Sequence, residues 1–283
     1  MSSVSPENRL NDLSAQDWLK FTKTWFIHNP PPRKKEEVLH PAKYPENIIK
    51  EFILFFTKPG ALVFDPFLGT GSTLVAAHQT GRNGIGIELQ KKYADIAKKR
   101  IVDLESQQKL TEQGSKLVSK QVILQGNSME LDKIWKEYAL PELDLVITSP
   151  PYGPMLNKKG LVSKEREEAG LDTNYSHDVQ DLGNAAGYDD FLQKLMKLFG
   201  QVIPHVKEQG HLVVILQNYM DKGNYQMLAW DFAREMSKRV QFRGERIWCQ
   251  DNKTLYPYGY RYSFVPNVHH HYCLIFKKIK KEE

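Results

Sequence analysis

Short runs of strand-forming residues alternate with longer amphipathic stretches over most of this chain. Such alternation is typical of a parallel sheet with helices on both of its faces. The last two strand-like runs follow each other without a helix, so we expect one of them to run antiparallel at the edge of the sheet. The seven predicted strands cover residues 61–66, 83–89, 121–128, 143–150, 211–219, 240–251 and 269–279.

The bulk composition is that of a soluble globular protein with a sizeable core. The chain has 283 residues, of which 41% are hydrophobic and 26% are charged. No apolar run approaches the roughly 18 residues that span a membrane, and the N-terminus lacks a signal-peptide pattern. Cys249 and Cys273 lie far apart without metal-site spacing, so we expect reduced thiols in a cytoplasmic protein. The net charge of +5 permits a polyanionic partner.

The chain divides into an arm and one domain. Residues 1–39 are interpreted as an N-terminal arm, which ends in a proline-rich stretch that favours an extended path. Residues 40–283 are predicted to form the domain, which begins with an amphipathic helix over residues 45–56. Residues 154–187 interrupt it with a polar, glycine-punctuated stretch. A structureless loop of that length is uncommon inside a compact domain and is often functional.

A glycine-rich loop, VFDPFLGTGST, lies between a predicted strand and a predicted helix. Gly69 and Gly71 allow the backbone to approach a ligand closely, and the start of a helix favours oxygen acceptors. A dinucleotide-binding loop would carry a third glycine where Leu74 stands, and Asp65 would repel a pyrophosphate. Glu88, at the end of the next strand, is placed to accept hydrogen bonds from ribose hydroxyls. This set predicts a positively charged nucleoside cofactor without a pyrophosphate, and S-adenosylmethionine (AdoMet) meets that description.

Three motifs resemble those of the amino-group DNA methyltransferases, which methylate cytosine N4 or adenine N6. They read HPAKYPENIIKEFI, FDPFLGTGST and TSPPYG, and the resemblance covers roughly residues 40–283 apart from the insertion. It implies a Rossmann-like, AdoMet-dependent methyltransferase fold with a seven-stranded, mostly parallel sheet. It also implies S-adenosylmethionine as cofactor, double-stranded DNA as substrate and a cognate restriction endonuclease as a candidate partner.

The same resemblance indicates which residues bind the cofactor. The first motif would help to hold the methionine part, and the second is the cofactor loop. Asn127 departs from the family pattern, in which many members have an acidic residue, but its amide can still hydrogen-bond the adenine. The predicted cofactor-binding residues are Lys43, Tyr44, Pro45, Asp65, Pro66, Phe67, Gly69, Thr70, Gly71, Ser72, Thr73, Glu88, Leu89, Asn127 and Ser128.

The third motif supplies the candidate catalytic residues Ser149, Pro150, Pro151 and Tyr152. An exocyclic amine is a poor nucleophile, so acceptors must hold its N–H groups. The Ser149 hydroxyl and the Pro150 carbonyl can accept them, while the prolines remove competing N–H donors. Tyr152 offers a ring on which a flipped base can stack. A serine at the first position resembles the cytosine-N4 branch, whereas aspartate or asparagine is more usual in the adenine branch. Methyl transfer needs no metal, and we expect none.

Several alternatives stay open at this point. The acceptor could be adenine N6 in DNA or a base in RNA, or the chain could be an inactive nucleic-acid-binding protein with a methyltransferase core. Leu74 disfavours a dinucleotide-dependent oxidoreductase. Target recognition is assigned first to residues 154–187 and second to the arm. The stretch YPYGYRYSF puts aromatic residues at alternate positions over 256–264, where an extended segment would present them on one face, either to nucleic acid or to packing beneath a loop.

Overall fold

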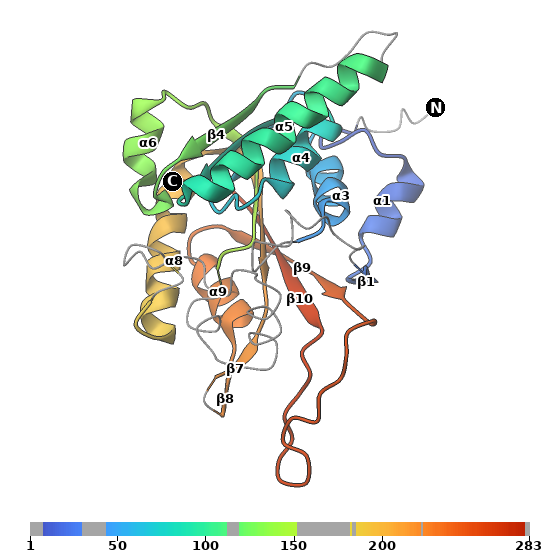
Figure 1. Ribbon diagram of the computed structural model, residues 1–283, viewed down its shortest axis with the longest axis vertical. Helices are drawn as coiled ribbons and strands as arrows, with labels where there is room; N and C mark the ends of the chain where they lie inside the picture. Colours follow the sequence, from blue (N-terminus) through green and yellow to red (C-terminus); the bar gives the residue numbers. More distant parts are fainter. Residues whose placement is uncertain are drawn as a thin grey trace, which may run out of the picture.

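An eight-stranded sheet lies at the centre of the computed structural model (Figure 1). Its strand order is β1-β9-β10-β6-β5-β2-β3-β4. The structure describes residues 8–29, 44–111, 119–151, 182, 185–221 and 223–280.

Five parallel strands form the half of the sheet that carries the predicted motifs. Neighbouring strands pair in parallel in the order β6-β5-β2-β3-β4. The chain runs outward from β2 through β3 to β4 and then returns to the other side of β2 as β5. Open α/β sheets bind ligands beyond the carboxyl ends of the strands at such a reversal. The strands are β2 (Leu62–Asp65), β3 (Asn83–Glu88), β4 (Gln121–Gln125), β5 (Leu143–Thr148) and β6 (Val206–Leu216).

The Rossmann-like class is confirmed, but two details of the predicted sheet are wrong. Strand β10 (His270–Lys277) pairs antiparallel with both β6 and β9 (Gln241–Cys249), so it lies inside the sheet and not at its edge. A hairpin keeps β9 and β10 adjacent, but the sequence does not say which of the two covers β6. The eighth strand, β1 (Trp25–Ile27), pairs with β9 from within the arm. Three residues are too few to show the period-two pattern of a strand.

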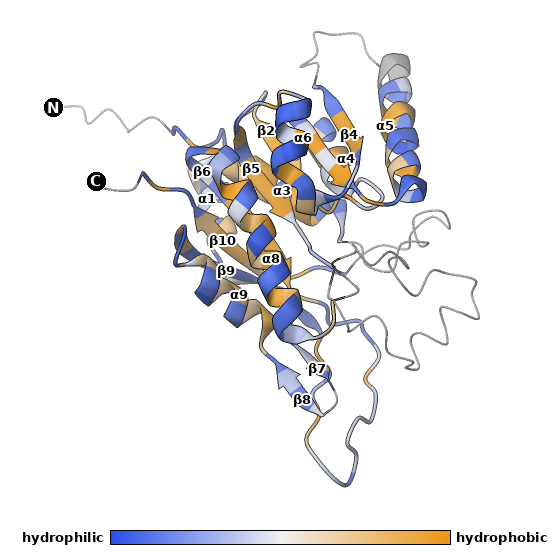
Figure 2. Ribbon diagram, turned by 90° about the vertical axis from the view of Figure 1, so that its left-hand side faces the viewer, coloured by the Kyte–Doolittle hydropathy of each residue, from blue (hydrophilic) through white to orange (hydrophobic). Residues whose placement is uncertain are grey.

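Helices cover both faces of the sheet, and their apolar sides point toward it (Figure 2). Helices α1, α3, α4 and α5 pack on one face, and α6, α8 and α9 pack on the other. None of the helices in the described ranges is long and apolar enough to cross a bilayer. The helices are α1 (Ala15–Phe21), α3 (Glu46–Phe56), α4 (Ser72–Gln79), α5 (Lys91–Thr111), α6 (Leu131–Glu137), α8 (Tyr188–Val202) and α9 (Leu228–Met236).

The alternation of glycine and isoleucine in β3 brings the glycine loop close to the sheet. Ile85 and Ile87 join the core beneath α6 and α8. Gly86 faces the opposite side, where a Cβ atom would lie 2.7 Å from the side chain of Leu68. The missing side chain therefore lets Leu68, in the middle of the loop, pack directly against the strand.

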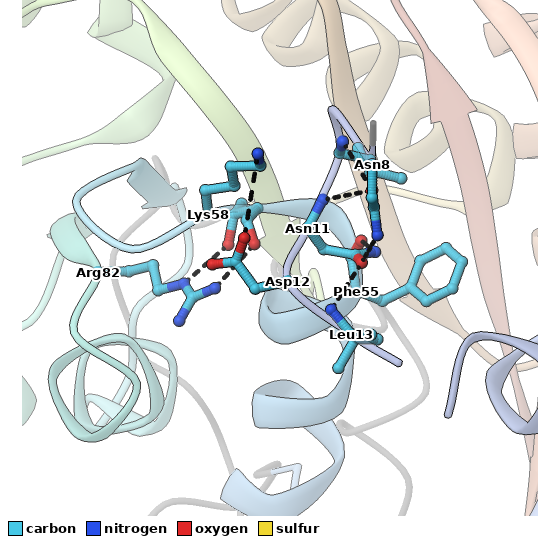
Figure 3. Close-up of polar contacts among 9 residues, drawn as sticks. Asn8, Asn11, Asp12, Leu13, Phe55, Lys58 and Arg82 are labelled. Atoms are coloured by element: carbon cyan, nitrogen blue, oxygen red, sulfur yellow. Dashed lines mark hydrogen bonds and ion pairs between the residues drawn. The ribbon is translucent and has the colours of Figure 1, made fainter. Parts of the chain in front are cut away.

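The described part of the arm packs onto the domain. The Asn11 side-chain amide donates to the carbonyl of Phe55 at 2.5 Å, and Asp12 lies 3.9 Å from the ammonium group of Lys58 (Figure 3). The ring of Phe21 stacks on that of Phe55 with 4.0 Å between centroids. Residues 8–29 thus complete the core on the α3 side. A role of the arm in target recognition stays a prediction.

Buried His211 on β6 should make the stability of the protein depend on pH. Burial, with smaller contributions from Lys277 and Arg243, lowers its pKa from 6.5 to about 4, and its ring lies 4.7 Å from that of Phe56. The folded state binds fewer protons than the unfolded state between these values, so the free energy of unfolding falls as the pH drops.

We expect this histidine to remove about 3 kcal/mol of stability between neutral pH and pH ~4. The measurement is urea unfolding of the wild type and of His211→Phe, because the difference between them excludes the carboxylates that titrate in the same range. His211→Phe should lose less stability on acidification by about that amount. Parallel pH profiles for the two proteins would contradict the assignment.

Candidate active site

The carboxylate of Asp65 is the centre of a buried hydrogen-bond network at the end of β2. Its side chain is completely buried. Oδ2 accepts from the hydroxyls of Tyr44 and Thr73, each at 2.5 Å. Oδ1 accepts from the hydroxyl of Thr148 at 2.6 Å and from the N–H of Phe67 at 2.9 Å. Asp65 therefore joins the segment before α3, the glycine loop, the start of α4 and the end of β5.

This network changes the interpretation of Asp65. A carboxylate offers about four acceptor positions, and four protein donors occupy them. Burial raises the pKa of Asp65, and the hydrogen bonds from Thr148, Thr73 and Tyr44 oppose that rise. Burial and the nearby carboxylate likewise raise the pKa of Tyr44 well above its ordinary value. We interpret Asp65 as the residue that positions the site, and its direct contact with a cofactor stays a prediction.

The glycine loop turns through two left-handed residues. Gly69 has a φ of 54° and Gly71 a φ of 90°, a region that favours glycine. A Cβ atom on Gly71 would lie 2.9 Å from the Cβ of Ala97 on α5. The guanidinium of Arg100, one turn further along α5, donates to the carbonyl of Thr70 at 2.7 Å. Helix α5 thus packs directly against the loop and holds its shape.

Arg100 is a site residue that the sequence motifs did not indicate. Besides Thr70 it pairs with Glu46 in the first turn of α3. Pro45, at the N-cap of α3, is buried beside Tyr44. The sequence signal was only a basic cluster on a helix, which resembles a solvated face. Lys43 lies outside the described residues, so its predicted contact is not described.

Glu88 is the last residue of β3, and its carboxylate holds the backbone of the glycine loop. One carboxylate oxygen accepts from the N–H of Gly69 at 2.8 Å, and the other accepts from the N–H of Gln90 at 2.9 Å. The side chain is buried and the following residue, Leu89, is partly buried. The carboxylate of Glu88 therefore accepts backbone N–H groups through both of its oxygens. Its predicted contact with ribose hydroxyls is compatible with this arrangement and stays a prediction.

The end of β4 lies beside the loop through two polar residues. Asn127 accepts the N–H of Met129 at 2.9 Å through its side-chain oxygen and so caps the short turn Ser128–Glu130. The hydroxyl of Ser128 donates to the carbonyl of Pro66. The predicted contact of Asn127 with the adenine stays a prediction.

The catalytic motif begins where β5 ends beside β2. The pairing of Phe64 with Val146 brings the two strand ends together, and Thr148 is bound to Asp65. Ser149 follows directly and is partly exposed, whereas Pro150 and Pro151 are buried. Tyr152 lies outside the described residues. Thr148 is part of the TSPPYG motif, but only its hydrogen bond with Asp65 reveals its role.

The residues of the loop fit the cofactor that the fold family implies. Within the described part of the chain, the hydroxyl oxygens of Thr70 and Ser72 are buried without a hydrogen-bond partner. An unpaired buried hydroxyl costs free energy, which a polar ligand would recover. These two hydroxyls, the left-handed glycines and the carboxylate of Glu88 lie together at the reversal point of the sheet. This donor and acceptor set suits S-adenosylmethionine.

Comparisons with known proteins find relatives of part of this chain. Residues 4–99 match the family model described as DNA methylase, N6_N4_Mtase. The Type II methyltransferase M.BglII of Bacillus subtilis is 38% identical over 73 residues, which are 26% of this chain and 20% of that protein. The Type II methyltransferase M.HinfI of Haemophilus influenzae is 45% identical over 65 residues, 23% of this chain and 18% of that protein. The chain therefore matches only about a fifth of the length of these relatives.

Among solved structures, an rRNA methylase from Streptococcus thermophilus aligns with a TM-score of 0.48 at 12% identity. The alignment covers 84% of this chain and 99% of that one.

The sheet order, the loop after β2 and the strand end at Thr148 define a Rossmann-like fold of the methyltransferase type. The family-model match over residues 4–99 and the similarity to Type II methyltransferases support the predicted amino-group DNA methyltransferase family. The family model names both N6 and N4, so it does not separate the two branches. The motif around Ser149 lies beyond the matched residues.

Replacing Gly71 by alanine tests the close packing of the loop. Gly60 is a matched control, because it has a φ of 80° but nothing within 4 Å of an added Cβ. We expect Gly60→Ala to cost about 1–2 kcal/mol for the left-handed backbone. Gly71→Ala should cost roughly a further 1–3 kcal/mol, because the new methyl overlaps Ala97. Urea unfolding measures both, and equal losses would show that helix α5 does not constrain the loop.

Proposed function

We propose that the protein transfers a methyl group from S-adenosylmethionine to the exocyclic N4 amine of a flipped cytosine in double-stranded DNA. The observation that carries this proposal is the 2.6 Å hydrogen bond between Thr148 and Asp65. It holds the start of the sequence SPPY beside the glycine loop. The family description, DNA methylase, supports DNA as the substrate.

Residues of the glycine loop are proposed to hold S-adenosylmethionine, which supplies an electrophilic methyl group when bound. The backbone at Gly69 and Gly71 permits close approach, and Glu88 offers acceptors for ribose hydroxyls. The unpaired hydroxyls of Thr70 and Ser72 offer further polar contacts. Asp65, also predicted as a contact, is proposed to act by positioning these residues. The remaining predicted cofactor contacts, proposed here as well, are Lys43, Tyr44, Pro45, Pro66, Phe67, Thr73, Leu89, Asn127 and Ser128.

The strand end is proposed to hold the amine of the base. The Ser149 hydroxyl accepts one N–H and the Pro150 carbonyl accepts the other, which directs the nitrogen lone pair toward the incoming methyl group. Neither proline has an N–H that could compete for these acceptors. Tyr152 stacks on the extruded base, which offsets part of the cost of flipping it out of the duplex. The amine loses its proton after the transfer, so no strong general base is needed beforehand.

Adenine N6 in DNA is the second candidate acceptor, because the matching family model names N6 as well as N4. Ser149 supports cytosine, since its resemblance is to the cytosine-N4 branch. An endonuclease that shares the target site is the proposed partner, because methylation would protect that site from cleavage.

The test is methyl transfer from labelled S-adenosylmethionine to DNA and, separately, to RNA. Each product is digested to nucleosides, and the labelled nucleoside is identified by mass. We expect N4-methylcytosine from DNA only. Label on adenine would overturn the choice of base, and label on RNA alone would overturn the substrate. Cofactor binding without transfer to either would favour a nucleic-acid-binding protein.

A further inference from the structure

The segment between β9 and β10, residues 250–269, projects from the end of the sheet that carries the candidate active site. Thr148, at the end of β5, pairs with Val214 in β6, and Val214 also pairs with Leu274 in β10. The residues of β10 that precede Leu274 therefore extend past the end of β5 on the side of the candidate active site. Because His270 pairs with Cys249, both stems of the segment leave the sheet at that end. Both views show it extending well past the strands (Figures 1 and 2). We call it the β9–β10 loop.

The β9–β10 loop has an ordered structure of its own. The side chain of Asn267 donates to the carbonyl of Tyr256 and accepts its N–H, both at 2.9 Å, and so joins the two stems. At the tip, the N–H groups of Tyr262 and Ser263 donate to the carbonyl of Gly259 at 2.9 Å. Gly259 has a φ of 70°. These bonds fix a tight turn far from the core.

The turn presents its aromatic rings to solvent. Tyr262 is 95% exposed and Phe264 is 91% exposed, the highest values among the large hydrophobic residues of the described chain. The prediction that alternate aromatic residues share one face is wrong, because the left-handed residues Gly259 and Arg261 reverse the chain. Packing beneath a loop is also wrong for these two rings. Rings held in solvent on an ordered turn indicate a binding surface.

The charges of the β9–β10 loop favour a polyanion. Residues 250–269 contain Lys253, Arg261 and one acidic residue, Asp251, which lies at the base of the loop and accepts a hydrogen bond from the side chain of Asn29. The guanidinium of Arg261 lies 5.3 Å from the centre of the Tyr260 ring at the tip. Cations interleaved with aromatic rings suit nucleic acid, because phosphates pair with the cations and bases stack on the rings. An apolar protein surface would gain nothing from this cation at the tip.

We propose that the β9–β10 loop is a DNA-binding element that places the Tyr262 or Phe264 ring against the bases next to the flipped nucleotide. The inference rests on the proposed function, since it takes duplex DNA as the partner. Flipping leaves a gap in the stack, and an aromatic or apolar side chain can fill such a gap or wedge between base steps. The loop is then a contact surface in addition to residues 154–187 and the arm.

The variants Tyr262→Ala and Phe264→Ala test this proposal. We expect each to weaken binding of fluorescent random-sequence DNA duplexes about tenfold, because a base stacked on a ring is lost. The KM for genomic DNA should rise in parallel. The affinity for S-adenosylmethionine and the Tm should not change, because both rings are exposed and lie away from the core. Tyr262→Trp keeps a stacking surface and should retain binding.

Tyr138→Ala is the matched control, since Tyr138 is an exposed tyrosine at the C-cap of α6, near the opposite end of the sheet. It should leave DNA binding unchanged. Equal effects of Tyr138→Ala and Tyr262→Ala, no effect of either loop variant, or a preference of the wild type for RNA would overturn the proposal. Unchanged variants of an enzyme that methylates DNA would overturn the loop assignment alone. DNA binding that depends on the loop, without any methyl transfer, would overturn the proposed function alone.

Discussion

Ser149→Ala should lower the turnover number for methyl transfer by roughly 10²–10³-fold, the loss typical of removing one preorganised hydrogen-bond partner of the reacting group. The reason is that the hydroxyl is proposed to hold the amine in the transition state. Ser149 is partly exposed and follows the strand, so the substitution should change stability little. Single-turnover kinetics and a separate titration with S-adenosylmethionine measure the two effects.

The affinity for S-adenosylmethionine should be the same in Ser149→Ala and in the wild type. Ser149→Thr is the matched control, because it keeps the hydroxyl and should keep much more of the activity than alanine does. Equal losses of turnover and of cofactor affinity would refute the assigned role. Activity of Ser149→Ala close to that of the wild type would refute it as well.

Asp65→Ala should lower the free energy of unfolding by at least ~3 kcal/mol, since several buried donors lose one charged acceptor. The hydroxyls of Tyr44, Thr73 and Thr148 and the N–H of Phe67 all donate to this carboxylate. Each hydrogen bond to a charged group contributes about 1.5–3 kcal/mol, and the three residues whose hydroxyls would lose this acceptor are buried. Urea unfolding measures the loss.

Asp65→Asn is the control that separates charge from hydrogen bonding. The amide keeps one acceptor oxygen and removes the cost of burying a charge, which is the cost that raises the pKa of Asp65. It should therefore destabilise the protein less than alanine does. If Asp65→Ala abolished binding of S-adenosylmethionine without changing stability, Asp65 would be a direct ligand and not the residue that positions the site.

The strands and helices that carry the motifs could be predicted because their signals are local. Residues 45–56 show a helical stripe of apolar side chains, and α3 spans nearly the same residues. Strand β1 and the inward position of β10 could not be predicted. Both depend on which strand edge a distant segment pairs with. Every strand edge presents the same backbone N–H and C=O groups, so the sequence does not indicate which edge a given segment will cover.

Some residues of the candidate site could likewise be predicted from the sequence, and others could not. Gly69, Gly71, Glu88 and Ser149 were found from their motifs, and the fold brings all of them to one edge of the sheet. Thr148 and Arg100 were missed as site residues. A threonine in a strand and an arginine on a helix are common, and only their contacts with Asp65 and Thr70 reveal a role.

The sequence alone determined the fold class, the glycine loop and the strand end at SPPY, because each follows from periodicity or from residues whose backbone geometry is restricted. Only the tertiary structure decided that Asp65 is shared among four donors from separate parts of the chain. It also decided that the aromatic rings of residues 262 and 264 face solvent. Both outcomes depend on what lies next to a side chain in space, and burial and hydrogen bonding between distant segments are set only when the chain packs.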